Sequence, residues 1–321
     1  MKTIRLTSFS LAIALSVGLM VGCGDDDKTT YTLPPIGGYN SSDEVSSSNL
    51  VAKWSFDGNL NESVNGLTGT PTGAAFTAGA KGQAWEGSST ESRYATVDGA
   101  SAIGALSSFS FSFWINTAGT IAPEVPGQGK GAQGIFALVK PNAFWGAMNL
   151  FLENPDASKP NRFLIKLLME NKRSGVVWQS QSPVFNVDNA MNTWTHIVFT
   201  YDAATSKMSA YQGGVLGASL SGPYSPETGY PGTYTVYAND PGDASNMNGA
   251  ALYGNLDFGG SYSKVLFGSM QFETTPSLTS EAGGQDWATS FAGKLDEFRV
   301  YKAALTPAEV NAIFELEKAG R

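Results

Sequence analysis

The sequence has little of the residue types that build many known sites. It contains one cysteine, Cys23, and one histidine, His196, in 321 residues. A tetrahedral zinc site needs several nitrogen or sulfur ligands, so these two residues argue against one. One cysteine cannot form an intrachain disulfide, and the stability of the chain must therefore come from the size of its core. His196 lies in the alternating segment 194–201, and we interpret it as a hydrogen-bonded strand residue.

Charged residues are also sparse, at 15% of the sequence, and the net charge is −8. Removal of residues 1–22 would take away Lys2 and Arg5 but no acid, which moves the net charge to −10. Nucleic acids and anionic lipid surfaces bind basic patches, so this balance argues against both as partners. After residue 21 no apolar stretch is long enough to span a membrane.

The N-terminus has the features of a secretory signal peptide. Lys2 and Arg5 precede an apolar run over 6–21, which is short for a membrane span. The residues Met20-Val21-Gly22-Cys23 resemble the lipobox of bacterial lipoproteins, with Met20 where Leu is usual. This resemblance implies cleavage after residue 22 and lipidation of Cys23, the anchor to the membrane. An ordinary signal sequence with a spare cysteine is the alternative.

The residues after Cys23 predict a location at the cell surface. Gly24-Asp25-Asp26-Asp27 is similar to the acidic export signal of Bacteroidetes surface lipoproteins, which implies the outer face of the outer membrane. A solvated linker is the alternative. Polar residues, Pro and Gly predominate up to residue 49 and predict a flexible tether. The expected parts are a signal peptide at 1–22, the lipidated cysteine and tether at 23–49, and a folded domain at 50–321.

The folded part has the composition and periodicity of an all-β protein. It is rich in glycine and aromatic residues, as expected of many short strands joined by turns. Alternation predicts strands at 50–56, 109–115 and 194–201. The ambiguous segment 162–170 is interpreted as a strand, and 212–214 as a hairpin turn. One helix is predicted, capped by Thr306, begun by Pro307 and ended by Gly320.

Three motifs follow one another over about residues 50–320. They are WSFDGN at 54–59 with GAKGQA at 79–84, FSFSFW at 109–114 with WTHIVFTYD at 194–202, and GKLDEFRVY at 293–301 before the helix. In these motifs the chain resembles the laminin-G-like jelly-roll family of the concanavalin A-like lectin/glucanase superfamily. The resemblance implies a two-sheet antiparallel jelly-roll sandwich with a short C-terminal helix. Against compact members of the family, residues of roughly 118–148 and 221–262 would be insertions.

The resemblance raises two further expectations, glycoside hydrolysis and a structural calcium ion. Glycoside hydrolysis needs two carboxylates about 5–9 Å apart. The Glu-x-Asp-x-x-Glu triplet of the glucanase branch does not occur in the sequence, although a pair distant in sequence stays open. The resemblance also implies a structural calcium ion shared by Asp57, Asp296 and backbone carbonyls, since Ca²⁺ prefers oxygen ligands. Alternatively, each aspartate accepts backbone N–H groups of a turn.

Aromatic residues beside amides and carboxylates predict a sugar-binding surface, because the apolar faces of sugars stack on rings while hydroxyl groups need polar partners. The candidate ligand-binding residues lie in or near the predicted insertions and before the last strand: Trp145, Trp178, Tyr224, Tyr230, Tyr234, Tyr237, Asn239, Asp240 and Trp287. Each aromatic residue could instead pack under its own loop, and tyrosine is also common in protein interfaces. The sequence predicts a surface lectin-like lipoprotein that captures oligo- or polysaccharide without cleaving it. An adhesin for a protein partner and a divergent glycoside hydrolase are the alternatives.

Overall fold

The structure is a computed structural model of the chain. It describes residues 33–88, 90–120, 131–153, 158–170, 180–181, 183–218, 220–221, 232–236, 252–258 and 262–321. The chain divides into two units, residues 1–34 and 35–321, and the description below concerns the second. The proposed lipidation site Cys23 and the predicted signal peptide lie outside the described residues.

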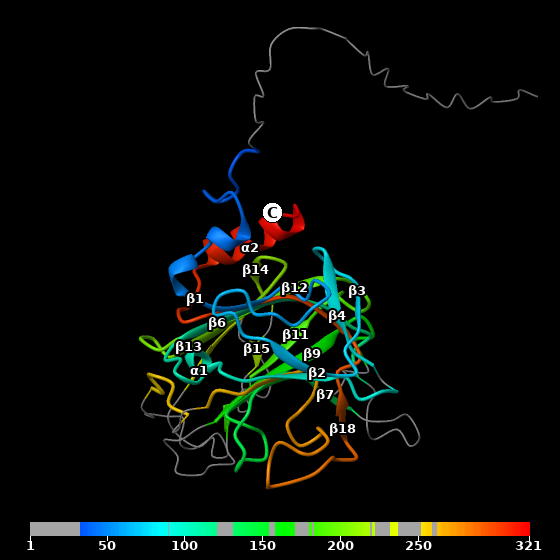
Figure 1. The fold of residues 1–321 in the computed structure, drawn as a ribbon. Coiled ribbons are helices and arrows are strands. Elements are labelled where there is room, and N and C mark those ends of the chain that lie inside the picture. Colours follow the sequence, from blue (N-terminus) through cyan, green and yellow to red (C-terminus); the bar gives the residue numbers. More distant parts are fainter. Residues whose placement is uncertain are drawn as a thin grey trace, which may run out of the picture. The chain divides into compact units, whose positions relative to one another are not determined.

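Two sheets packed face to face form the second unit (Figure 1). The nine-stranded sheet has the order β14-β13-β12-β6-β19-β4-β3, with β1 paired to β19 and β16 paired to β13. Its strands are β1 (Leu50–Trp54), β3 (Phe76–Ala78), β4 (Gln83–Glu86), β6 (Phe109–Asn116), β12 (Thr195–Asp202), β13 (Lys207–Gln212), β14 (Val215–Leu216), β16 (Thr233–Thr235) and β19 (Lys294–Tyr301).

The ten-stranded sheet has the order β15-β11-β9-β8-β7-β17-β5-β2, with β10 paired to β9 and β18 paired to β7. Its strands are β2 (Gly69–Thr72), β5 (Tyr94–Val97), β7 (Ala132–Leu138), β8 (Met148–Glu153), β9 (Phe163–Glu170), β10 (Ser180–Gln181), β11 (Val184–Val187), β15 (Leu220–Ser221), β17 (Val265–Phe267) and β18 (Ala288–Ser290). Within the described ranges, only β18 and β7 pair in parallel. The helices are η1 (Ser42–Glu44), η2 (Ser47–Asn49), α1 (Ser101–Gly104) and α2 (Pro307–Lys318).

Alternating aromatic residues build the core between the sheets. Phe109, Phe111 and Phe113 of β6 are fully buried. Phe136 from the other sheet packs against Phe298 of β19, with ring centroids 5.0 Å apart. Because successive side chains of a strand point to opposite faces, this alternation places one face of β6 in the core. The predicted antiparallel two-sheet sandwich with a short C-terminal helix is confirmed.

Local signals in the sequence correspond to the observed elements. The segment 162–170 forms β9, and the hairpin between β13 and β14 turns through Gly213 and Gly214, which both have positive φ angles. Thr306 accepts a hydrogen bond from the backbone of Glu309 and completes a capping box at the start of α2. His196 is hydrogen-bonded as predicted, since its Nε2 lies 2.9 Å from the hydroxyl of Ser112.

Residues 132–138, within the predicted insertion at 118–148, form β7 in the middle of the ten-stranded sheet. Every residue of β7 is buried. A strand that is buried on both faces has no alternation of apolar and polar residues, and periodicity therefore does not reveal it.

The compact unit also begins earlier than residue 50. Val45 is 1% exposed and packs in an apolar cluster with Leu305 and Ile313 of the C-terminal segment. The backbone N–H and the hydroxyl of Ser42 both donate to the carbonyl of Arg321. The prediction of a flexible tether is therefore wrong over residues 35–49, which belong to the compact unit. The polar composition of this segment gave no indication of its buried Val45 or of the ion contacts of Asp43.

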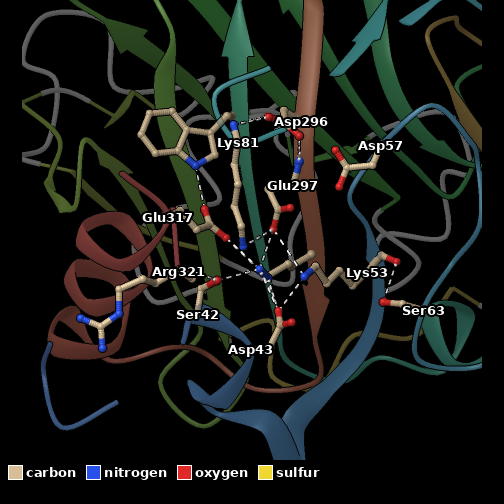
Figure 2. Close-up of polar contacts among 12 residues, drawn as sticks. Ser42, Asp43, Lys53, Asp57, Ser63, Lys81, Asp296, Glu297, Glu317 and Arg321 are labelled. Carbon is tan, nitrogen blue, oxygen red and sulfur yellow. Dashed lines mark hydrogen bonds and ion pairs between the residues drawn. The ribbon is translucent and has the colours of Figure 1, made fainter. Parts of the chain in front are cut away.

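A buried ion network fastens this N-terminal segment and α2 to the outer side of the nine-stranded sheet (Figure 2). The fully buried guanidinium of Arg299 donates to Glu317 at 3.1 Å, to Glu297 at 2.6 Å and to Asp43 at 3.1 Å. Lys53 adds an ion pair of 2.6 Å to Asp43. Neither α1 nor α2, the two α-helices within the described ranges, is long and apolar enough to cross a membrane.

Candidate functional site: an aromatic face of the ten-stranded sheet

The outward face of the ten-stranded sheet carries a cluster of aromatic rings. Met148, Leu150 and Leu152 of β8 point into the main core, so Phe151 between them lies on the opposite face. Side chains from two other segments join Phe151 there. We call the five rings the aromatic platform: Phe144, Trp145, Phe151, Phe272 and Trp287.

The platform has a buried base and a partly exposed upper layer. Phe151 and Phe272 are 2% and 0% exposed, whereas Phe144, Trp145 and Trp287 are only partly buried. Trp145 stacks on Phe151 with ring centroids 5.6 Å apart at 13°, and its centroid lies 5.4 Å from that of Trp287. Phe144 stacks on Phe272 at 4.4 Å. The two tryptophans thus present ring surface on a rigid apolar support.

Two local structures hold these tryptophans together. The backbone carbonyl of Trp287 accepts hydrogen bonds from Gly131 and Ala132 at the start of β7. Trp145 lies in the turn between β7 and β8, where the side-chain amide of Gln271 donates to the carbonyl of Lys140. The same amide nitrogen also donates to the carbonyl of Ala143. The parallel β18–β7 pairing and this turn bring residues from distant parts of the chain to one place.

Two polar residues on the same face, Asn149 and Glu170, lie beside the platform, and Lys140 after β7 forms an ion pair with Glu170. We call these three residues the polar set. Asn149 is fully buried, and in the described part of the chain neither its amide nitrogen nor its oxygen has a hydrogen-bond partner. Glu170 forms an ion pair with Lys140 through Oε1, while its Oε2 has no partner among the described residues. Buried polar atoms without partners are rare, because each costs about 1–3 kcal/mol.

The strand register places Asn149 and Glu170 next to the rings. Asn149 is opposite Leu168 of β9, so Glu170 is its diagonal neighbour, roughly 7–8 Å away. Asn149 and Phe151 are two residues apart on one strand and share a face, roughly 7 Å apart. The arrangement places a buried amide and a buried carboxylate next to an apolar ring surface.

A second acid near the platform, Glu153, does not form a hydrolytic pair with Glu170. Glu153 is opposite Leu164, six residues from Glu170 along β9, which corresponds to roughly 20 Å. Glycosidase carboxylates are about 5–9.5 Å apart. Glu153 instead forms an ion pair of 2.5 Å with Lys166.

The structure brings together two of the predicted ligand-binding residues, Trp145 and Trp287. Tyr234 lies in β16, which belongs to the nine-stranded sheet, away from the platform. Tyr253, from the same predicted insertion, is 1% exposed and donates to the carbonyl of Glu170 at 2.8 Å, so it packs in the core. The other predicted residues lie outside the described part: Trp178, Tyr224, Tyr230, Tyr237, Asn239 and Asp240.

Sequence reasoning missed most of the platform and the whole polar set. Phe151 had a usable signal, because it interrupts the apolar face formed by its neighbours in β8. Asn149, Glu170 and Lys140 had none, since isolated polar residues in or beside apolar strands are usually exposed.

Asp57 and Asp296 hold one turn from two sides. Asp57 accepts the backbone N–H of Gln83 at 2.7 Å, and Asp296 accepts that of Lys81 at 2.9 Å. Figure 2 shows Asp296 and Lys81 in this arrangement. A Cβ on Gly82 would come within 2.2 Å of the Asp57 carboxylate, so this turn requires a glycine there.

The Asp296 carboxyl is fully buried, and this burial raises its pKa to about 7, with a further increase from neighbouring Glu297. A cation beside it would offset that cost. No cluster of three or more histidine, cysteine or acidic side chains suited to a metal occurs in the described ranges. Asp57 and Asp296 therefore fit a calcium ion only if backbone carbonyls or waters supply the remaining ligands.

Comparison with known proteins gives likeness in fold alone. No protein-family model matches the sequence, and no curated protein matches it. A structure of botulinum neurotoxin type C, a toxin whose cell entry depends on two ganglioside molecules, is similar to this chain. It matches with a TM-score of 0.53 at 16% identity, over 86% of this chain and 53% of the toxin chain. The binding domain of botulinum neurotoxin DC in complex with SialylT matches with a TM-score of 0.51 at 15% identity, over 85% and 52%.

Domain 4 of AbnA, an extracellular arabinanase from Geobacillus stearothermophilus, in complex with arabinotriose, matches with a TM-score of 0.46 at 17% identity, over 83% of this chain and 98% of that domain. This chain spans about half the length of the toxin chains. The toxin likenesses agree with the two-sheet sandwich described above.

Proposed function

We propose that this protein is a surface-anchored, lectin-like glycan-binding protein that captures oligo- or polysaccharide without cleaving it. One observation carries the proposal. Trp145 and Trp287 meet as a partly exposed ring pair on the outward face of a sheet, beside the unpartnered polar atoms of Asn149 and Glu170. These two tryptophans are far apart in the sequence, and only the fold brings them together.

The chemistry of this face matches that of a sugar. A pyranose or furanose ring has an apolar C–H face, which stacks on an aromatic ring, and a rim of hydroxyl groups that donate and accept hydrogen bonds. The tryptophan pair supplies the ring surface. The amide of Asn149, which can donate and accept, and a carboxylate oxygen of Glu170 are suited to hydroxyl groups.

Proteins of similar fold provide general support. Among the matching toxin structures, one is in complex with SialylT and one belongs to a toxin whose cell entry depends on gangliosides. A third is in complex with a protein, rat synaptotagmin II. At 15–16% identity these ligands are not transferable to this chain. The proposal therefore rests on the residues of the platform and the polar set, within the laminin-G-like family that the sequence motifs resemble.

The test is affinity electrophoresis of the purified chain in gels that contain a panel of polysaccharides. We expect at least one glycan to retard the wild type, and expect Trp145→Ala and Trp287→Ala to reduce the retardation severalfold. Trp194→Ala is the matched control, because Trp194 is a partly exposed tryptophan of the other sheet. Absence of retardation by every glycan, with calcium and with chelator, would contradict the proposal.

A protein partner is the alternative, because half-exposed tryptophans also form the centres of protein interfaces. Gel retardation and hydrogen exchange together distinguish glycan binding from protein binding. Retardation by a glycan that depends on Trp287 supports capture of sugars. A face that binds no glycan but is protected by a protein partner from hydrogen exchange would instead identify an adhesin. Release of reducing ends from a bound glycan would indicate a hydrolase.

The proposal includes a lipid anchor at Cys23 and exposure on the outer membrane. The compact unit begins at residue 35, so it starts closer in sequence to Cys23 than the predicted boundary at residue 50. In cell fractionation, Cys23→Ser should move the protein from the membrane fraction to the soluble fraction; unchanged membrane association would contradict the anchor.

A structural calcium ion between Asp57 and Asp296 is part of the proposal as well. A ligand that binds only the folded state raises the melting temperature. We expect calcium to raise it and a chelator to reverse the rise. An unchanged melting temperature would leave the two aspartates as turn residues.

A further inference from the structure

A pocket on the outward side of the nine-stranded sheet is separate from the aromatic platform. It has a volume of about 490 Å³, within the usual range of small-molecule sites. Strands β6, β12 and β14 and helix α2 supply the residues that define it. We call it the β14 pocket, after its rim: Trp114, Trp194, His196, Val215, Leu216 and Phe314.

The β14 pocket has a ring-covered wall and an apolar rim. The rings of Trp114, His196 and Phe314 pack on one another, with Trp114 and Phe314 stacked at 5.7 Å. Val215 and Leu216 at the rim are 62% and 46% exposed. Exposed apolar side chains that surround a pocket are typical of a binding site.

Two polar groups at the pocket lack partners. The partly exposed Trp194 makes no ring contact in the described part of the chain, and its indole N–H donates no hydrogen bond there. His196 is 1% exposed, and its Nδ1 has no partner among the described residues, while its Nε2 is bonded to Ser112. The buried and unpartnered Nδ1 is a second, independent sign of a site.

The side chains of Thr195 and Gln212, which also line the pocket, already have hydrogen-bond partners. The hydroxyl of Thr195 donates to the carbonyl of Thr193, and both amide atoms of Gln212 bind the backbone of Asp188. A sugar ring with several hydroxyl groups would leave most of them without partners here. A ligand with one hydrogen-bonding group matches the groups that are free.

The pocket also favours an uncharged ligand. None of the residues that line it is acidic, lysine or arginine. Burial, with the nearby Arg299 guanidinium, lowers the pKa of His196 to about 3, so its imidazole is neutral at pH 7. The pocket therefore offers no counter-ion to a carboxylate or an ammonium group.

From the pocket volume, the stacked rings and the two unpartnered polar groups, we propose that the β14 pocket binds a small, uncharged aromatic compound of the phenol class. The ring of the ligand packs against Phe314, Trp194 and the apolar rim. Its hydroxyl group pairs with the Trp194 N–H or with His196 Nδ1. This site is independent of the glycan-binding face and does not rest on it.

The test is calorimetric titration of the purified full chain with 4-methylphenol at pH 7. We expect saturable binding at one site, and at least tenfold weaker binding of benzoate and of methyl glucoside. Trp194→Ala and Leu216→Ser should each weaken 4-methylphenol binding at least tenfold. Trp287→Ala, on the opposite sheet, is the matched control and should leave it unchanged.

The outcomes are distinct. Leu216 is exposed, so Leu216→Ser decides the question even if Trp194→Ala does not fold. Binding that is absent in the wild type, equal for benzoate, or insensitive to Leu216→Ser would overturn the proposal. Glycan retardation by the platform is measured separately, and therefore either proposal can fail without the other.

Discussion

Replacement of Arg299 by methionine tests whether the buried ion network holds the N-terminal segment and α2 on the nine-stranded sheet. Arg299 is fully buried, and so are its partners Glu297 and Glu317, at 1% exposure each. Methionine preserves much of the side-chain volume but removes the positive charge. Two buried carboxylates then remain, with Lys53 at 3.5 Å from Glu297 as partial compensation.

Removal of one partner from a buried ion pair typically costs about 3–5 kcal/mol, because the remaining charge is uncompensated in a medium of low polarity. Arg299→Met should therefore lower the free energy of unfolding by about 4 kcal/mol. In a domain of this size, that corresponds to a decrease in melting temperature of roughly 10 °C. The loss should appear as a lower urea midpoint with little change in slope.

Arg162→Met is the matched control. Arg162 forms an ion pair of 2.7 Å with Asp188, but the two side chains are 18% and 38% exposed. Partly exposed pairs of this kind contribute about 0–1 kcal/mol, so the control should stay within about 1 kcal/mol of the wild type. Equal small effects of both substitutions would refute the reasoning. Recovery of stability by a second change, Glu317→Leu, would strengthen it, because this change removes an uncompensated charge.

Three further substitutions have expected outcomes. The pKa of Asp296 is raised to about 7 from its usual 3.8. The stabilisation by its neutral form is therefore complete below pH 3.8 and is lost as the pH rises through 7. Asp296→Asn should remove this pH dependence from the melting temperature measured in chelator between pH 4 and pH 7. Thr306→Ala removes the cap of α2 and should cost about 1 kcal/mol in urea unfolding; no change would refute a contribution of the cap. Asn149→Leu removes two unpartnered buried atoms and should stabilise the fold by about 1–3 kcal/mol while weakening glycan retardation; loss of stability would mean that Asn149 has a partner in solution.

Local features of the chain were predictable because their causes lie within a few residues. Thr306 and Glu309 form the capping box that their spacing indicates, and Gly213-Gly214 turns the hairpin through positive φ angles. The alternation in 109–115 places phenylalanine in the core for the same reason, since the side-chain period of a strand is two.

The candidate site was only partly predictable. The composition singled out Trp145 and Trp287 as aromatic residues near loops, but only the β18–β7 pairing makes them neighbours. Asn149 has no local signal at all, because its role depends on residues of β9 across the strand register. The start of the compact unit was misplaced for a similar reason: Val45 is buried by residues from the far end of the chain.

The amino-acid sequence alone determined the class of the fold and the ends of helix α2, since strand alternation, glycine turns and caps act over short distances. It also contains the N-terminal pattern on which the proposed anchor at Cys23 rests. Only the tertiary structure decided which aromatic and polar side chains form a surface. Contacts between residues far apart in the sequence depend on sheet order and register, and these are set by the packing of the whole core.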